Sequence, residues 1–133
     1  MKTLFASEAI SKSGRTETIQ ARDGLRNVTS GSSSEKPAPN PEQSFPDAYS
    51  DSYHSALVNA ARKLGTSVKD STVRARVSLI ENDRGSKRLA VEMHAQLPGI
   101  DRAQVQRIMA EAHKTCPYTQ ALPGDTSFEL VVD

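Results

Sequence analysis

The sequence predicts a single α+β domain formed by all 133 residues. Three observations support this fold class. Several short segments alternate apolar and polar residues, as strands with one solvated face do, and a long central segment has helical periodicity instead. These segments follow in the order strands, helix, strand pair, helix, strand, which favours α+β over a parallel α/β sheet.

The first predicted strands lie near the N-terminus. Residues 2–10 alternate loosely, and residues 16–20 contain two threonines and an isoleucine, which suit a returning strand. Gly14 and Arg15 separate the two segments, so we expect a hairpin. Residues 27–40 contain four serines, a glycine and two prolines, with almost nothing to bury, and this composition predicts a loop or mobile flap.

The main helical pattern runs from residue 41 to residue 65. Apolar and small residues recur there at three- and four-residue spacing. They are Phe45, Ala48, Tyr49, Ser52, Tyr53, Ala56, Leu57, Ala60 and Leu64. Because proline is tolerated in a first helical turn, the regular helix is predicted to begin near Pro46, after one short turn at 41–43. Gly65 is expected to end it.

The second half of the chain alternates more strictly. Apolar residues in the segments 73–79 and 89–97 predict two strands, which the turn residues at 82–85 should join as an antiparallel pair. Asp101 is expected to cap a second helix that stops before Pro117. The apolar residues of that helix are Val105, Ile108, Met109 and Ala112. Alternation at Phe128, Leu130 and Val132 predicts a last strand.

Composition disfavours several classes of protein. Basic and acidic residues number 17 and 16, and the local cluster of Arg84, Lys87 and Arg88 falls at a predicted turn, so no nucleic-acid partner is expected. No segment approaches the ~20 apolar residues of a membrane span, and the N-terminal apolar run is too short for a signal peptide. A single cysteine, Cys116, cannot form an intramolecular disulfide. We therefore expect a cytoplasmic protein without a membrane partner.

Two familiar catalytic patterns fail on geometry. Asp51, Ser52 and His54 are near neighbours in sequence, but helical side chains one or two positions apart point in different directions, so they cannot form a hydrolase triad. His54, His94 and His113 fall on separate predicted elements without the spacing of metal ligands. Neither a metal nor another cofactor is predicted.

Four motifs, in order along the chain, carry a resemblance to a known family. They are Gly14 with Arg15, the Asn-Pro-Glu-Gln sequence at 40–43 followed by Phe45, Leu-Pro-Gly at 97–99, and Cys-Pro-Tyr-Thr at 116–119 with Gly124 after it. Over nearly its whole length the chain resembles organic hydroperoxide resistance proteins of the osmotically inducible protein C (OsmC) family. The resemblance implies an OsmC-like fold, with antiparallel sheets around a long central helix, in an intertwined homodimer.

The resemblance also implies thiol peroxidase chemistry. In that family a cysteine of the central helix attacks the O–O bond of an organic hydroperoxide, and a second cysteine condenses with the resulting sulfenic acid. A dithiol reductant, typically lipoyl-linked, reopens the disulfide. Matched by motif, Cys116 is the second cysteine, Arg15 holds the attacking thiolate and Glu42 orients Arg15. A nearby guanidinium lowers the pKa of a thiol, and the thiolate is the nucleophile.

The family pattern is broken at the attacking position, which is Ser52 in this sequence. A serine hydroxyl stays protonated at neutral pH and has no sulfenate chemistry, so the chain is predicted to be inactive as a peroxidase. Pro46, Asp47 and Asp51 also replace residues that are usually small and apolar in the family. These further departures favour a natural divergent paralogue over an engineered variant.

Three functions remain open at this point. The chain is an organic hydroperoxide reductase by lineage, or a non-catalytic relative that binds an apolar small molecule or partner in the former pocket, or a protein in which Cys116 acts alone as a peroxidase or redox sensor. Simple structural roles remain open for Ser52 as a small packing residue, for an ion pair of Arg15 with Glu42, and for Cys116 as an inert buried thiol. The apolar fraction of 36% indicates a thin core, which favours completion by a second subunit over a monomer with a disordered segment.

Overall fold

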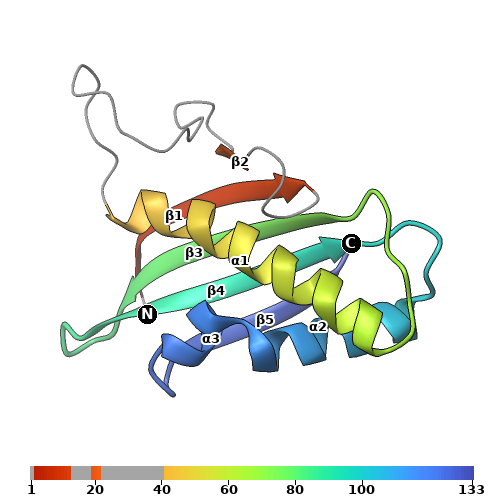
Figure 1. Ribbon diagram of the computed structural model, residues 1–133. Coiled ribbons are helices and arrows are strands. Elements are labelled where there is room, and N and C mark those ends of the chain that lie inside the picture. Colours follow the sequence, from red (N-terminus) through yellow and green to blue (C-terminus); the bar gives the residue numbers. More distant parts are fainter. Residues whose placement is uncertain (1, 13–18, 22–40) are drawn as a thin grey trace.

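The computed structural model describes residues 2–12, 19–21 and 41–133, and Arg15 and the predicted loop at 27–40 lie outside these residues. Figure 1 shows one sheet with helices lying across it. The strands are β1 (Lys2–Lys12), β2 (Ile19–Ala21), β3 (Thr72–Glu81), β4 (Lys87–Gln96) and β5 (Ser127–Val132). The helices are α1 (Pro41–Lys63), α2 (Arg102–Thr115) and α3 (Pro117–Ala121).

The described strands form one five-stranded sheet in the order β2-β1-β3-β4-β5. The neighbours β2 and β1, β1 and β3, and β3 and β4 are antiparallel, which confirms the predicted pairing of the two central strands. The last pair differs from the expected antiparallel arrangement, because β5 runs parallel to β4. A parallel neighbour requires a crossover connection, and α2 and α3 supply it. The fold class is α+β, as predicted, with a mixed sheet.

The central helix α1 begins earlier than predicted. Its first residue is Pro41, where the missing N–H needs no partner, and Pro46 lies inside the helix instead of at its start. Pro46 therefore removes one intrahelical hydrogen bond, which the buried packing of its ring offsets. The predicted end is confirmed: Gly65 has φ of 78°, and Thr66 N donates to Ala61 O at 2.8 Å in a Schellman motif.

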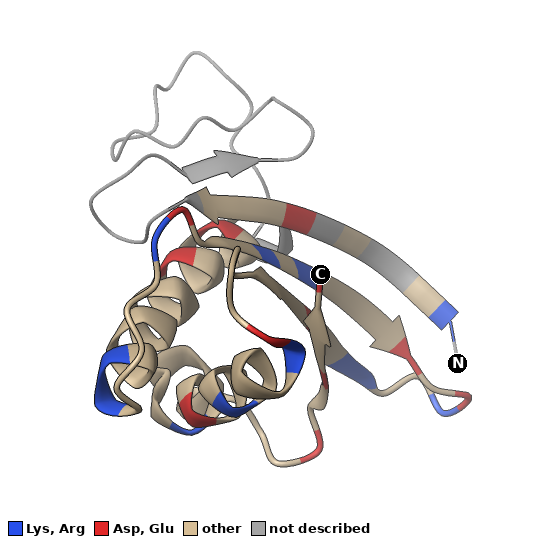
Figure 2. Ribbon diagram, turned by 90° about the vertical axis from the view of Figure 1, so that its right-hand side faces the viewer, with Lys and Arg blue, Asp and Glu red and all other residues tan. Residues whose placement is uncertain are grey.

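The hydrophobic core lies between the helices and one face of the sheet. Figure 2, turned by 90° from Figure 1, shows these two layers with acidic and basic residues interspersed around them. The sheet contributes Val73, Ala75, Val77, Val91, Met93 and Ala95. The helices contribute Tyr49, Tyr53, Ala56, Leu57, Ala60, Ala61, Val105, Ile108, Met109 and Ala112. Leu64, expected on the buried face of α1, is 42% exposed because the helix has already ended beside it.

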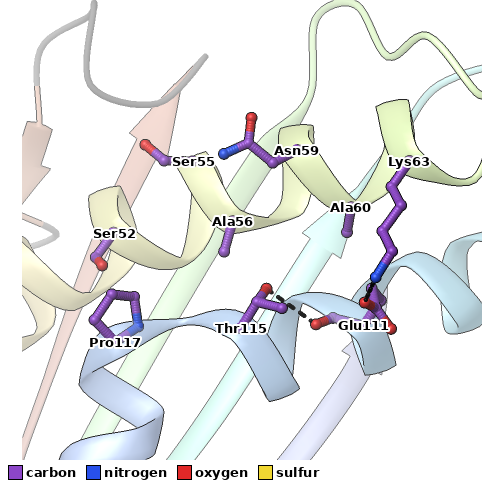
Figure 3. Close-up of a pocket in the computed structure, with 9 residues that line it drawn as sticks. All are labelled: Ser52, Ser55, Ala56, Asn59, Ala60, Lys63, Glu111, Thr115 and Pro117. Carbon is purple, nitrogen blue, oxygen red and sulfur yellow. Dashed lines mark hydrogen bonds and ion pairs between the residues drawn. The ribbon is translucent and has the colours of Figure 1, made fainter.

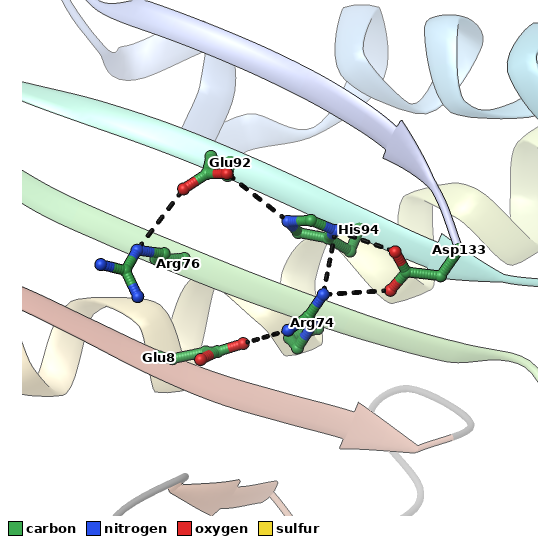
Figure 4. A network of polar contacts seen from close by, with 6 residues as sticks. All are labelled: Glu8, Arg74, Arg76, Glu92, His94 and Asp133. Atoms are coloured by element: carbon green, nitrogen blue, oxygen red, sulfur yellow. Dashed lines mark hydrogen bonds and ion pairs between the residues drawn. The ribbon is translucent and has the colours of Figure 1, made fainter.

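The opposite face of the sheet carries a ladder of charged side chains (Figure 4). Arg74 Nη1 lies 3.0 Å from Glu8 Oε1 and Arg74 Nη2 lies 3.3 Å from Asp133 Oδ2, while His94 Nδ1 lies 3.0 Å from Asp133 Oδ1. Ion pairs at a solvated surface contribute little to stability, typically about 0–1 kcal/mol each. This face is therefore the solvated side of the sheet, and Ser52 and Cys116 lie on the helical side.

His54 is buried between α1 and the sheet. Its Nδ1 lies 3.2 Å from Ser11 Oγ on β1, and its Nε2 lies 2.7 Å from Ser71 Oγ just before β3. Burial lowers the pKa of His54 to about 4 from its ordinary value of 6.5, because the charged imidazole would lose its hydration. The neutral ring is thus the form that fits the folded chain.

Acid should therefore destabilise the fold through His54. The unfolded chain binds a proton at this residue below about pH 6.5 and the folded chain only near pH 4, so the contribution is complete above 6.5 and is lost between these values. The expected loss is on the order of 3 kcal/mol, from 1.36 kcal/mol per pKa unit. Urea unfolding at pH 7, 5.5 and 4 measures it.

The His54→Gln variant is the control for this titration. The pKa of His113 is also lowered by burial, and carboxylates protonate over the same interval, so only the difference between the two proteins isolates His54. The native protein should lose more free energy of unfolding than the variant between pH 7 and 4. Identical losses would show that His54 does not drive the acid sensitivity.

Candidate functional site

The two positions assigned by motif to the sulfur chemistry lie in contact. Ser52 is on α1 and Cys116 is at the end of α2, and Ser52 Oγ lies 3.8 Å from Cys116 Sγ. Ser52 is 4% exposed and Cys116 is fully buried. Positions that are distant in sequence are therefore adjacent in the fold, as the resemblance requires of two cooperating residues.

The local sequence around α2 explains why Cys116 lies there. Asp101 caps the helix by accepting a hydrogen bond from Gln104 N at 3.0 Å, as predicted from the sequence. The predicted apolar face of α2 packs on α1 and the sheet. Cys116 N donates the last helical bond to Ala112 O at 2.8 Å, and the extended backbone of Cys116 then turns the chain away from the helix axis.

The short helix α3 follows immediately and was not predicted. Proline ends a helix but also favours the first position of the next one, and Pro117 occupies that position in α3. Thr119 of α3 hydrogen bonds Tyr49 of α1, and the rings of Tyr118 and Phe45 stack with centroids 6.0 Å apart. Cys116 thus lies at a corner, residues 115–121, whose following residues contact the central helix. We refer to it as the α2–α3 corner.

A groove of about 420 Å³ opens beside Ser52, between α1 and α2 (Figure 3). Ser52 and Pro117 lie at one end, and the ion pair of Lys63 Nζ with Glu111 Oε1, 2.8 Å apart, lies at the other. The remaining lining residues are Ser55, Ala56, Asn59, Ala60 and Thr115. The groove therefore has a floor of small side chains, and the hydroxyl of Ser52 is at its edge.

The hydrolase triad is excluded by the directions of the side chains, as predicted. Ser52 faces Cys116, whereas both ring nitrogens of His54 face the serines at 11 and 71. Ser52 accordingly has no imidazole beside it to accept its proton, and its hydroxyl stays a weak nucleophile. Ser52 and His54 lie on the same turn of α1, but their side chains contact different parts of the fold.

The other two predicted site residues are not placed beside Ser52 by the structure. Arg15 lies outside the described residues, and Glu42 is described only as part of the α1 backbone. Their roles stay predictions. Tyr49 and Thr119 are site neighbours that sequence reasoning did not single out, although both belong to segments that it used, the helical face and the Cys-Pro-Tyr-Thr motif.

Across residues 2–12, 19–21 and 41–133, histidines, cysteines and carboxylates do not gather in threes around a possible metal position. Among the helices of these residues, none combines the length and apolar character needed to cross a membrane.

The sequence is similar to a known protein family and to several of its named members. The family described as OsmC-like protein matches residues 31–131. Organic hydroperoxide resistance protein OhrB of Bacillus subtilis is 26% identical over 132 residues, 96% of each chain. Organic hydroperoxide resistance protein OhrA of the same organism is 35% identical over 97 residues, which are 71% of this chain and 67% of the relative.

Solved structures agree with these sequence matches. The crystal structure of an organic hydroperoxide resistance protein from Legionella pneumophila superposes with a TM-score of 0.66 at 28% identity, over 99% of each chain. That of OhrB from Bacillus subtilis gives a TM-score of 0.67 at 24% identity, over 98% of this chain and 99% of the other. The resemblance read from the four motifs is confirmed, and the chain belongs to the OsmC-like protein family.

Proposed function

We propose that this chain is an organic hydroperoxide resistance protein by lineage, a thiol peroxidase of the oxidative stress response whose catalytic cycle is interrupted at Ser52. The contact of Ser52 Oγ with Cys116 Sγ at 3.8 Å carries the proposal. Two residues matched to the attacking and resolving cysteines by separate motifs need not be neighbours in an unrelated fold. Their adjacency favours a site inherited from a two-thiol enzyme.

The steps of the interrupted catalytic cycle can be written as bonds formed and broken. A thiolate at position 52 would attack the peroxide oxygen, break the O–O bond, release an alcohol and become a sulfenic acid. The Cys116 thiol would then displace hydroxide from that sulfur, forming a disulfide and water. A lipoyl-type dithiol would reduce the disulfide to two thiols. Ser52 cannot begin this sequence, since its oxygen is protonated and forms no stable analogue of the sulfenic acid.

Arg15 and Glu42 complete the proposed site. An arginine close to a thiol favours the thiolate, and a carboxylate can hold the arginine in place. Cys116 alone is a poor replacement for the attacking residue, because a fully buried thiol is shielded from peroxides. This burial favours the interpretation of Cys116 as inert in the folded chain over that of a one-cysteine peroxidase.

The protein with Ser52 should show no dithiol-dependent turnover of cumene or tert-butyl hydroperoxide above background. The cycle needs two sulfurs, and the chain has one cysteine. The rate of peroxide loss in the presence of dihydrolipoamide measures this, with buffer and the Cys116→Ser variant as blanks. Sustained turnover that Cys116→Ser abolishes would show that Cys116 suffices and that the roles assigned here are wrong.

The Ser52→Cys variant should regain peroxide chemistry. Sulfur replaces oxygen in a side chain of similar size that already touches Cys116 Sγ, so one equivalent of organic hydroperoxide should consume both thiols of a chain. Turnover should remain below that of two-cysteine relatives, because Asp47 and Asp51 lie on the same helix and nearby carboxylates raise the pKa of a thiol. Counting free thiols before and after a dithiol measures the change.

Ser55→Cys is the matched control. Ser55 lines the same groove one helical turn further on, but its hydroxyl donates to Asp51 O at 3.1 Å and it is not the partner of Cys116. This variant also has two thiols and should form no internal disulfide. Survival of both thiols in Ser52→Cys would refute the inherited peroxidase site, and a non-catalytic protein that binds an apolar small molecule would become the better account.

We also infer that the chain functions as a homodimer. The groove leaves Ser55 partly exposed and Asn59 exposed on α1, and side chains of modest size allow another helix to approach closely. The opposite face of the sheet carries the charged side chains of Figure 4 instead. A second copy of this chain against the α1 groove would complete the thin core expected from composition.

Light scattering at micromolar concentration should give about twice the 14.4 kDa of one chain. Asn59→Arg, which places a long charged side chain in the groove, should shift the protein toward the monomer. Gln106→Arg, at an exposed position of α2 outside the groove lining, should not. A native protein that stays folded as a monomer would contradict the homodimer. If Asn59→Arg and Gln106→Arg shifted the mass equally, the interface would not be the α1 groove.

A further inference from the structure

The α2–α3 corner offers the central helix little surface, because α3 has only five residues. Helix α1 packs extensively on α2 and on β1 and β3, and only lightly on α3. The corner nevertheless carries Cys116, whose position relative to residue 52 decides whether the two side chains can react. A few specific contacts therefore have to hold this short segment in place.

Two of the described contacts between the corner and α1 involve Tyr49. Its hydroxyl hydrogen bonds Thr119 Oγ1, and its ring lies 5.9 Å from the ring of Tyr118 and 5.2 Å from that of Phe45, centroid to centroid. Tyr49 is 1% exposed and Thr119 is 8% exposed. The hydrogen bond is therefore shielded from water, where losing one partner leaves a buried polar group unsatisfied.

The direction of this hydrogen bond follows from acidity. Burial raises the pKa of Tyr49 to about 12, so the phenol keeps its proton throughout the neutral range. A phenol is a stronger acid than an aliphatic alcohol, so Tyr49 donates and Thr119 accepts. The bond should then persist unchanged across physiological pH.

The hydrogen bond of Tyr49 with Thr119 is close to the pair formed by positions 52 and 116, both in sequence and in space. Tyr49 precedes Ser52 by three residues on α1, and Thr119 follows Cys116 by three residues through the first turn of α3. Residues three apart on a helix lie on the same face. The bond of Tyr49 to Thr119 and the contact of Ser52 with Cys116 therefore join the same two segments, one helical turn apart.

We propose that Tyr49 is a positioning residue that latches the α2–α3 corner: its hydrogen bond to Thr119 keeps the Cys116 thiol against residue 52 and out of solvent. The assignment of a redox reaction to positions 52 and 116 rests on the proposed function, whereas the latch is a property of the native chain. Release of the bond lets the corner open, which separates Cys116 from residue 52 and exposes the sulfur to reagents.

The native chain allows a direct test because Cys116 is its single cysteine. The thiol is fully buried, so alkylation by iodoacetamide requires an opening, and its rate reports the population of the open form. Tyr49→Phe removes the hydroxyl and keeps the ring, and Thr119→Val removes the other partner. Each should raise the alkylation rate in the absence of denaturant about three- to tenfold, the range expected for one hydrogen bond.

Tyr53→Phe is the matched control. Tyr53 is a second buried tyrosine of α1, also 1% exposed, and its hydroxyl donates to Met109 O of α2 at 3.0 Å. Removing that hydroxyl takes one similar hydrogen bond from the same helix and leaves the bond of Tyr49 to Thr119 intact. Its alkylation rate should stay within about twofold of the native rate, as should that of Thr119→Ser, which keeps a hydroxyl.

The dependence on urea separates local from global opening. Low urea concentrations should leave the alkylation rate of Tyr49→Phe nearly unchanged, since opening one corner exposes little surface. The double variant Tyr49→Phe with Thr119→Val should react no faster than either single variant, because both remove one bond. An unchanged alkylation rate in Tyr49→Phe would overturn the latch. So would an equal rise of the alkylation rate in Tyr53→Phe, if both rates increased with urea as steeply as global unfolding does. Neither result involves peroxide, so failure of the latch is distinct from failure of the proposed function.

Discussion

Within a single turn, the central helix α1 directs consecutive side chains at different partners, and the rest of the structure depends on these contacts. Three consecutive residues have three different partners: Ser52 contacts Cys116, Tyr53 donates to Met109 O, and His54 hydrogen bonds serines from β1 and from the segment before β3. A rotation of α1 about its axis would break all of these contacts together. The helix is thereby fixed in rotation as well as in position, and so is the side chain at position 52.

This constraint explains how the geometry of a sulfur site can persist without its chemistry. Serine and cysteine differ by one atom, so under the proposed function the helix would keep its orientation, and Cys116 its contact, after a thiol at position 52 was replaced by a hydroxyl. The partners that fix α1 are the sheet and α2, not the reacting atom. The proposed loss of peroxidase chemistry would therefore cost little stability, as expected of a natural paralogue that keeps the fold of its relatives.

Local patterns in the sequence predicted those parts of the fold that local physics determines. The alternation in 73–79 and 89–97 identified the central hairpin, Gly65 marked the end of α1 and Asp101 the start of α2. The errors arose where packing outweighs local preference. Pro46 is accommodated inside α1 because its ring is buried, and Leu64 is exposed because the helix stops before the core covers it.

The candidate site was predictable only in part, for a similar reason. Motifs identified Ser52 and Cys116, and their contact agrees with that assignment. No sequence motif indicates the bond of Tyr49 with Thr119, because this bond depends on α3. Helix α3 is one turn long and begins with Pro117, which from sequence is equally consistent with the end of the preceding helix. Short elements of this kind are stabilised by tertiary contacts more than by their own propensity.

The parallel direction of β5 is what brings the two site residues together. An antiparallel β5 could follow β4 through a tight turn, and the intervening residues would then have no reason to cross the sheet. Because β5 is parallel to β4, the connection must return along one face of the sheet, and α2 and α3 do so beside α1. Cys116 lies in this crossover. The contact of Cys116 with Ser52 is therefore a consequence of the sheet topology, which makes the parallel pair as necessary to the site as the motif that contains the cysteine.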